Sequence, residues 1–235
     1  MKIAVDAREL AGQPTGVGRY LGELLERWLA RSDERTRDIV LYAHEPLTSG
    51  PATATPHVII PGSGGTAWEQ WTLRRALARS GAAVFFAPAY TAPLAITIPV
   101  VLTIHDISFE RHPQWFPIPT RWRRRVLTRL SARRARHVLT VSEFSAIEIQ
   151  NAYGIARSRI SVIPHGVKSR APGDDDEPRE PLILFVGSIF NRRRVPDLIT
   201  ALRYVRRGVP NARLVIVGAN RTYPHQDLAA DARRA

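Results

Sequence analysis

The chain has 235 residues, of which 44% are hydrophobic, so it can form one large or two modest domains with a sizeable core, which argues against global disorder. It contains no cysteine, which excludes a disulfide framework and a thiolate metal site, and no run of about 18 apolar residues that would span a bilayer. Thirty-four Lys and Arg against 21 Asp and Glu give a net charge of +13, which favours nucleic acid, acidic lipid or a phosphorylated small molecule as partner.

Almost all of the cations are arginine, since lysine occurs only at Lys2 and Lys168. An arginine-biased genome would give the same composition, and the sequence alone leaves that explanation open. The first residues, MKIAVDAREL, contain an apolar run too short for a signal peptide, and acids follow at once. Together with the lack of cysteine, this predicts a cytoplasmic protein.

Short, nearly continuous apolar runs alternate with amphipathic stretches along the chain. Strands are predicted at residues 2–6, 38–43, 82–87, 100–104, 137–141, 160–163, 182–186 and 213–217. Helices are predicted at residues 17–30, 67–80, 120–135, 143–151 and 196–207. Apolar runs of this kind are typical of strands covered on both faces, so the pattern predicts an α/β fold with a doubly wound parallel sheet between helices.

A break in composition divides the chain. Residues 168–181, KSRAPGDDDEPREP, contain three prolines, a glycine and an acidic run without apolar periodicity, and are predicted to be a linker. Residues 1–167 are predicted to form a complete Rossmann-like domain, and a strand–helix–strand pattern starts again in residues 182–235. Because a full doubly wound half needs about six strands, the second domain is expected to be the beginning of such a half.

The loop after the first predicted strand brings Gly16, Gly18 and Gly22 to the start of a predicted helix. Their spacing differs from the dinucleotide fingerprint, and Gly16 lies ten residues beyond Asp6, too far for its tight turn, which argues against NAD. Gly16 and Gly18 are therefore candidates for a loop that lets a ligand approach the helix start. The alternative is a flexible turn with a helix cap.

His105 and Asp106 follow a predicted strand. Ligands bind beyond the carboxyl ends of parallel strands, so both residues are candidates to contact a sugar hydroxyl or phosphate, and Asp106 also to orient His105. The alternative is a capping pair at a strand end. No second histidine at ligand spacing and no nucleophile elbow accompany them, so neither a metal site nor a serine nucleophile is predicted.

The predicted helix at residues 120–135 lies in a segment with eight arginines, TRWRRRVLTRLSARRAR. Its cationic face is a candidate surface for an anionic membrane or for nucleic acid. The residues assigned to this surface are Arg121, Arg123, Arg124 and Arg125. The alternative is an exposed helix of an arginine-rich protein that docks on the core through an apolar stripe of Trp122, Val126 and Leu130, which Leu127 can extend.

The stretch LILFVGSIFNRRRVPDLITALRYV, residues 182–205, places three adjacent arginines where a strand passes into a helix. Gly187 allows a close backbone approach, and the helix start and the planar donors of Arg192, Arg193 and Arg194 suit phosphate. The stretch therefore predicts a phosphate site. The alternative is a solvated basic loop.

Five blocks occur in this order in family-4 glycosyltransferases of the GT-B fold: TGVGRYLGELL, TIHDISFERHPQWF, VLTVSEFSAIEI, ISVIPHGV and LFVGSIFNRRRVPDLITAL. The chain thus resembles that family, and especially its bacterial mannosyltransferase-like members, over nearly its whole length. The resemblance implies a retaining transfer of a hexose, with mannose as the guess, from a nucleotide sugar to a glycan or lipid-linked acceptor. It implies no metal and no other cofactor.

The resemblance also assigns roles to single residues. Arg192 and Arg193 match the basic pair that grips the donor pyrophosphate, and Gly187 ends the first strand of the donor domain, as Gly218 ends the second. As the bond to the sugar breaks, these arginines would stabilise the negative charge on the leaving pyrophosphate, which in the family's usual proposal itself accepts the acceptor proton. No protein nucleophile is then needed.

On the acceptor side, Gly16 and Gly18 match the loop that closes over donor phosphates and acceptor, and His105 matches the residue that meets the transferred sugar near its anomeric centre. This sequence departs from the family's pattern in two places. Arg194 occupies a position where the family usually has Asn. The family's paired-glutamate segment, which holds the donor ribose and sugar, lies further on than residue 235, so the donor domain is expected to be truncated.

Several alternatives stay open from the sequence. The chain is either an enzyme, or an inactive fragment or one half of a split glycosyltransferase that folds without catalysing, or, remotely, a basic nucleic-acid-binding protein. The expected partners are a nucleotide sugar, a glycan or lipid-linked acceptor, an anionic membrane surface, and a second copy or partner chain that completes the second domain; nucleic acid is not expected. With these partners the protein is expected in the cytoplasm, and at the inner face of the membrane if it contacts the membrane.

Overall fold

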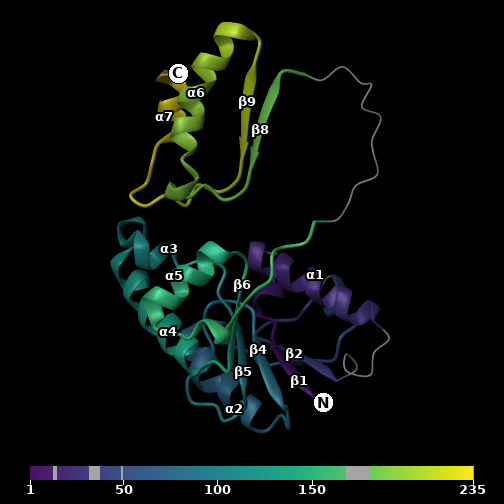
Figure 1. Cartoon of the computed structure of the whole chain (residues 1–235). Helices are drawn as coiled ribbons and strands as arrows, with labels where there is room; N and C mark the ends of the chain where they lie inside the picture. Colours follow the sequence, from purple (N-terminus) through teal and green to yellow (C-terminus); the bar gives the residue numbers. More distant parts are fainter. Residues whose placement is uncertain (13–14, 32–37, 49, 168–179, 235) are drawn as a thin grey trace. The chain divides into compact units, whose positions relative to one another are not determined.

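A computed structural model describes residues 1–12, 15–31, 38–48, 50–167 and 180–234 (Figure 1). The chain divides into two compact units, which we treat separately. Unit 1 consists of Met1–Glu110 and Trp122–Gly166, and unit 2 of Arg111–Arg121 and Val167–Ala235. The predicted linker at residues 168–181 lies, apart from Glu180 and Pro181, outside the described residues.

Unit 1 is built on a seven-stranded parallel sheet in the order β3-β2-β1-β4-β5-β6-β7. The strands are β1 (Ile3–Asp6), β2 (Ile39–Ala43), β3 (His57–Ile59), β4 (Val84–Ala87), β5 (Val100–Thr103), β6 (His137–Thr140) and β7 (Ile160–Val162). This arrangement confirms the predicted doubly wound α/β fold. The order reverses at β1, which pairs with both β2 and β4, and α/β proteins bind ligands beyond the carboxyl ends of strands at such a point.

The helices of this unit follow the strands in the predicted order. They are α1 (Gly16–Ala30), a π-helix at Trp68–Leu73 that continues as α2 (Arg74–Ala78), α3 (Ser108–Arg111), α4 (Ile118–Arg134) and α5 (Glu143–Tyr153). The last residue of α3 and the first turn of α4 belong to the segment Arg111–Arg121, which is counted with unit 2. Leu21 and Leu25 are one helical turn apart on α1, and both are fully buried in the cluster that contains Val5, Leu41 and Phe86. This packing fixes α1 against the sheet and so sets the position of its first turn, which carries Gly16 and Gly18.

The stripe of Trp122, Val126 and Leu130 on α4 does not dock on the core, so the alternative offered for this helix from the sequence is wrong in that respect. Trp122, Val126 and Leu130 are 55%, 49% and 38% exposed, and Ile118, one turn earlier, is 61% exposed. The buried residues of α4 are instead small or polar: Thr128, Ser131 and Ala132. Small side chains let the helix backbone approach its neighbours closely, which leaves the large apolar side chains on the outside. Among the described residues, no helix has the length and apolar character needed to cross a membrane.

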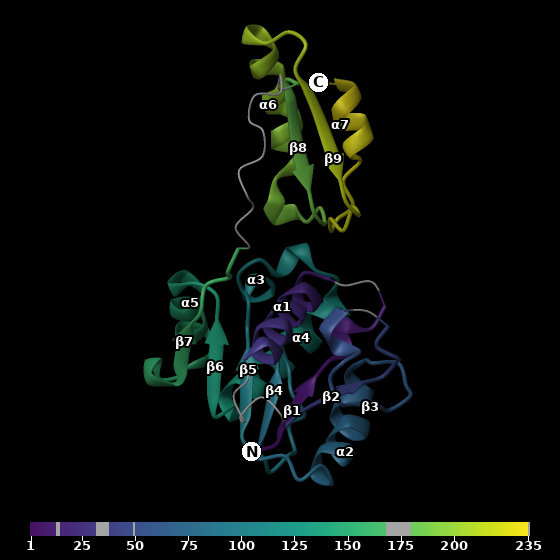
Figure 2. The same ribbon diagram turned by 90° about the vertical axis from the view of Figure 1, so that its right-hand side faces the viewer.

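Unit 2 contains two parallel strands, β8 (Leu182–Val186) and β9 (Arg213–Val217), with α6 (Val195–Gly208) and α7 (Leu228–Arg234), as Figure 2 shows. Val195 and Ile199 of α6 are buried with Ile189, and Phe185 and Ile216 pack against them. This packing covers one face of the strand pair. The alternate residues of the strands, among them Leu184, Val186 and Val217, are exposed on the other face.

Candidate functional site

The carboxyl edge of β1 leads into the loop that starts α1. Thr15 is the N-cap of α1: its Oγ1 accepts a hydrogen bond from the Gly18 N–H at 3.2 Å and donates one to Glu9 Oε2 at 2.8 Å. Gly18 is buried, whereas the position of a Cβ at Gly16 is open space. The two predicted glycines therefore form the first turn of a capped helix at the edge of the sheet where ligands bind.

His105 follows β5 at the same edge of unit 1. Its Nε2 lies 3.0 Å from the Pro88 carbonyl oxygen, and its ring is edge-on to Tyr20 at 4.9 Å and stacked on His165 at 5.8 Å. Burial lowers the pKa of His105 from its usual value, because the charged form loses solvation. A neutral ring whose Nε2 donates to Pro88 retains Nδ1 as a hydrogen-bond acceptor.

Hydrogen bonds from Ser108 and Tyr90 help to hold Asp106. Its Oδ1 accepts a hydrogen bond from the Ser108 N–H at 2.8 Å, and the Tyr90 hydroxyl donates to its Oδ2 at 3.3 Å. The first bond is the capping contact that the sequence offered as the alternative. The second ties Asp106 to a tyrosine whose ring is also 5.7 Å from His105.

Tyr90 has an uncommon backbone conformation, with φ of 63°. An aromatic residue rarely adopts this left-handed region, and the strain is of the order of 1–3 kcal/mol. Its N–H donates to Thr103 O at 2.9 Å, and this bond anchors the residue to the end of β5. Strain of this kind concentrates at functional sites, and here it sets the Tyr90 ring beside His105.

An ion-pair network that was not predicted from the sequence lies behind this edge. Arg8 Nη2 bonds Asp6 Oδ2 at 2.7 Å and Glu69 Oε2 at 2.8 Å, and Arg8 Nη1 donates to the Gly64 carbonyl at 2.9 Å. Thr91 Oγ1 donates to Glu69 Oε2 at 2.8 Å. The network therefore links the end of β1, the π-helix and the residue that follows Tyr90.

The charges of this network perturb one another. Burial raises the pKa of Glu69, and the nearby guanidinium of Arg8 opposes that rise. Burial alone would lower the pKa of Arg8, but the charges of Asp6 and Glu69 raise it, so Arg8 stays protonated. One half-buried cation thus compensates two buried carboxylates.

The residues of the predicted phosphate site lie in unit 2, where Gly187 follows the last residue of β8. Gly187 and Gly218 have φ of 140° and 150°, a region that glycine adopts and other residues rarely do. Arg192 and Arg193 are in a single helical turn directly before α6, and the Arg192 guanidinium lies over the Phe190 ring at 4.5 Å. Both arginines are exposed, so their donors are open to an anionic ligand.

Arg194 has φ of 52° and lies between this turn and α6. Asn tolerates the left-handed region better than a long side chain does, which gives a physical reason for the Asn that the family usually has here. We expect Arg194→Asn to stabilise unit 2 by about 0.5–1 kcal/mol, less the small contribution of the exposed pair with Asp197. Hydrogen exchange of the α6 amides measures this change.

The control for this substitution is Arg193→Asn, which makes the same change at an exposed residue of the helical turn with no left-handed backbone. Equal protection of the α6 amides in the two variants would contradict the proposed strain at Arg194.

The structure thus places the predicted residues in two groups. Gly16, Gly18, His105 and Asp106 belong to unit 1, and Gly187, Arg192 and Arg193 belong to unit 2. Tyr20 and His165, which contact His105, lie in sequence blocks that the family resemblance had marked without assigning them a role. Within the described residues, no group of three or more His, Asp or Glu is arranged to hold a metal ion.

Comparison with known proteins identifies the family. The model of Glycosyltransferase Family 4 matches residues 14–170. The structure of Anabaena Alr3699/HepE in complex with UDP and glucose is 19% identical to this chain in sequence, with a TM-score of 0.65; the match covers all of this chain and 65% of HepE. The structure of HepE in complex with UDP-glucose is 18% identical, with a TM-score of 0.66, and the match covers all of this chain and 66% of HepE.

The apo form of the lipopolysaccharide outer core galactosyltransferase WaaB is 11% identical, with a TM-score of 0.55 over 94% of this chain and 68% of that one. No curated protein matches the chain. The chain spans about 65% of the length of the HepE structures, and these likenesses establish the fold as that of GT-B glycosyltransferases. With two thirds of its residues matched by the family model, the chain belongs to glycosyltransferase family 4.

Proposed function

We propose that the chain contributes to a retaining glycosyltransferase that transfers a hexose, mannose-like, from a nucleotide sugar to a glycan or lipid-linked acceptor. The observation that carries this proposal is the exposed turn of Arg192 and Arg193 after Gly187, at the start of α6, in a chain that belongs to family 4. The UDP and UDP-glucose bound by HepE support a nucleotide sugar as the substrate class.

In this proposal the two arginines bind the donor diphosphate. Their guanidinium groups offer planar, paired donors, and the first N–H groups of α6 add a positive helix end. As the glycosidic bond breaks, negative charge grows on the diphosphate, and the arginines stabilise it more strongly in the transition state than in the ground state. The leaving phosphate then accepts the proton of the acceptor hydroxyl, so no residue of the protein forms a covalent bond to the sugar.

His105 and Asp106 are proposed to act on the sugar side. The half-buried ring of His105, whose lowered pKa favours the neutral form, presents a hydrogen-bond acceptor without adding positive charge next to a sugar that becomes cationic in the transition state. Asp106 is held by Tyr90 and Ser108 and is proposed to bind a sugar hydroxyl or to orient His105.

The experiment that tests the donor site is titration calorimetry with UDP and with GDP. Arg192→Ala and Arg193→Ala are each expected to weaken binding of the nucleotide by about 1.5–3 kcal/mol, which is the usual size of a charge-assisted hydrogen bond. Arg203→Ala is the matched control, because Arg203 is an exposed arginine farther along α6. Unchanged affinity in both site variants would rule out this assignment.

A membrane contact is the second candidate function, and the exposed stripe of α4 favours it. Ile118, Trp122, Val126 and Leu130 recur every fourth residue and are exposed, so they lie along one side of the helix. Of the four arginines assigned to this surface, Arg123 and Arg124 are exposed, whereas Arg121 and Arg125 are half-buried. Arg125 Nε also bonds Glu110 Oε2 at 2.6 Å. We propose that this stripe enters the interface of an anionic bilayer, where a lipid-linked acceptor would lie.

Trp122→Ser is expected to reduce co-sedimentation of the chain with anionic liposomes several-fold, because it removes the largest apolar side chain of the stripe. Trp71→Ser is the matched control, since Trp71 is 58% exposed, close to the 55% of Trp122, but belongs to the π-helix. Binding should also fall with salt. Equal loss in the two variants, or equal binding to neutral vesicles, would contradict the proposed contact.

A further inference from the structure

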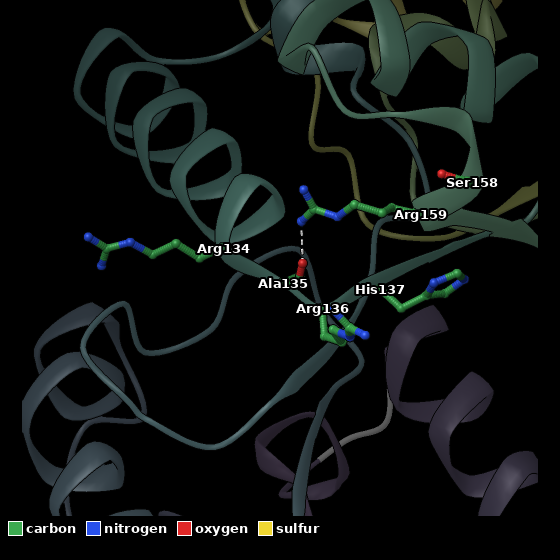
Figure 3. A pocket seen from close by; sticks show the side chains of 6 residues that line it. All are labelled: Arg134, Ala135, Arg136, His137, Ser158 and Arg159. Carbon is green, nitrogen blue, oxygen red and sulfur yellow. Dashed lines mark hydrogen bonds between the residues drawn. The ribbon is translucent and has the colours of Figure 1, made fainter.

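A basic pocket lies at the opposite edge of the sheet of unit 1 from His105. It has a volume of about 500 Å³ and is lined by Arg134, Ala135, Arg136, His137, Ser158 and Arg159 (Figure 3). The lining comes from the end of α4, the start of β6 and the short helical turn Arg157–Arg159. Since His137 begins β6 and pairs with Val101 near the start of β5, the pocket is at the amino edge, whereas His105 follows the carboxyl end of β5.

The side chains of the lining contribute three guanidinium groups and no carboxylate. Arg159 Nη2 donates to the carbonyl oxygens of Arg133, at 2.9 Å, and Ala135, and Arg134 Nη1 donates to the Leu94 carbonyl. These partners are backbone groups without formal charge, so the positive charge of the pocket is not cancelled. Like charges in one pocket repel, and an anionic ligand would relieve that repulsion.

Arg159 has a structural explanation as well. Its bonds to two carbonyls at the end of α4 satisfy groups that the helix leaves unpaired, and they fix the guanidinium in place. Arg136 has no such explanation, because its side chain is exposed and has no hydrogen bond or ion pair with any described residue. Figure 3 shows the Arg159 side chain reaching toward Ala135, with Arg136 beside it, whereas Arg134 and His137 extend away in opposite directions.

We propose that this pocket binds a phosphate monoester, with Arg136 and Arg159 as its principal ligands. A phosphate group accepts several hydrogen bonds from guanidinium groups, and the fixed fork of Arg159 is pre-organised for it. The Ser158 hydroxyl also lines the pocket, and the volume leaves room for an organic group attached to the phosphate. The phosphate belongs either to a soluble phosphorylated compound or to the headgroup of a lipid. This site is independent of the proposed sugar transfer.

The first experiment titrates the whole chain with inorganic phosphate at constant ionic strength and follows the backbone amide signals of Ser158 and His137 by NMR. We expect saturable shifts, and an affinity about ten-fold lower in Arg136→Gln, the usual effect of losing a charge-assisted hydrogen bond. Arg75→Gln is the matched control, because Arg75 is an exposed arginine of α2 in the same unit, and it should change the affinity less than two-fold.

The Arg136 side chain has no hydrogen bond or ion pair with any described residue, and the backbone bond from its N–H to Val100 O does not depend on the side chain, so the substitution is expected to leave the fold intact. Arg192→Gln separates binding at the turn before α6 from binding in this pocket. Shifts that rise linearly without saturation, or equal affinities in Arg136→Gln and Arg75→Gln, would overturn the proposal.

The second experiment identifies the source of the phosphate. Vesicles of phosphatidylcholine with phosphatidic acid carry a phosphate monoester, and vesicles with phosphatidylglycerol of the same charge carry a diester. Stronger binding to phosphatidic acid that depends on Arg136 supports the site and assigns it to a lipid headgroup. The other supporting outcome is that inorganic phosphate binds saturably while vesicle binding does not depend on Arg136. That outcome assigns the site to a soluble ligand.

Discussion

Replacing Arg8 with methionine is expected to lower the free energy of unfolding of unit 1 by about 3–5 kcal/mol. The substitution removes the cation that pairs with both Asp6 and Glu69, and each carboxylate is only 4% exposed in its side chain. Methionine retains most of the side-chain volume, so the loss reports the unpaired charges rather than a cavity. Urea unfolding, with hydrogen exchange of the β1 amides to assign the transition to unit 1, measures the effect.

The loss in Arg8→Met should depend on pH. Burial raises the pKa of Glu69 in the folded state, and without Arg8 that pKa rises further. The folded state therefore keeps a proton on Glu69 up to a higher pH than the unfolded state does. Stability therefore falls as the pH rises through this range, and the deficit of the variant is larger at pH 8 than at pH 5. Adding Glu69→Gln should recover part of the deficit at pH 8, because it removes one of the two unpaired charges. A deficit that is independent of pH would point to packing instead.

Replacing Gly218 with alanine is expected to destabilise unit 2 by about 3 kcal/mol, from the strained backbone and the steric overlap together. A Cβ at this position would lie 2.0 Å from the Gly187 carbonyl oxygen, so the ends of β8 and β9 must separate. The Gly187 N–H donates to Val217 O at 2.9 Å across this junction, and that bond is expected to weaken. Hydrogen exchange of the β8 and β9 amides measures the loss within unit 2 directly.

Gly187→Ala is the control for this prediction. Gly187 has a similar φ, but nothing lies within 4 Å of the position of its Cβ, so the substitution adds the backbone strain without the overlap. Gly218→Ala should therefore accelerate exchange more than Gly187→Ala does. Equal rates would mean that the two strands separate at their ends without cost, and that the close approach of the two glycines has no structural role.

Much of the fold was predictable because nearly continuous apolar runs mark its central strands. The strands that form β1, β2, β4 and β5 are buried and continuous, and each was predicted within two residues of its observed bounds. β3 was missed because it has only three residues, His57–Ile59, which are exposed or half-buried at the edge of the sheet. The outward stripe of α4 was misjudged because the periodicity of apolar residues identifies a helix face but not whether that face is covered.

The site was predictable only where residues follow strand ends. His105, Asp106 and Gly187 come directly after apolar runs, and the edge of a parallel sheet collects such residues. The partners of Arg8 and the conformation of Tyr90 were not predictable, because Glu69 is 61 residues from Arg8 in sequence and a tyrosine with φ of 63° has no local sequence signal. Tertiary packing decides both.

The order of the strands has a consequence for synthesis at the ribosome. β1 is translated first, yet its neighbour on one side, β4, ends at Ala87, so a shorter nascent chain leaves one edge of this apolar strand unpaired. Among the strand pairings of this sheet, the pairing of Ile3 with Val84 closes the longest loop and so has the largest loop-closure entropy cost. After that closure, β5, β6 and β7 each join the edge left by the strand before, so this half of the sheet grows outwards in the order in which it is translated.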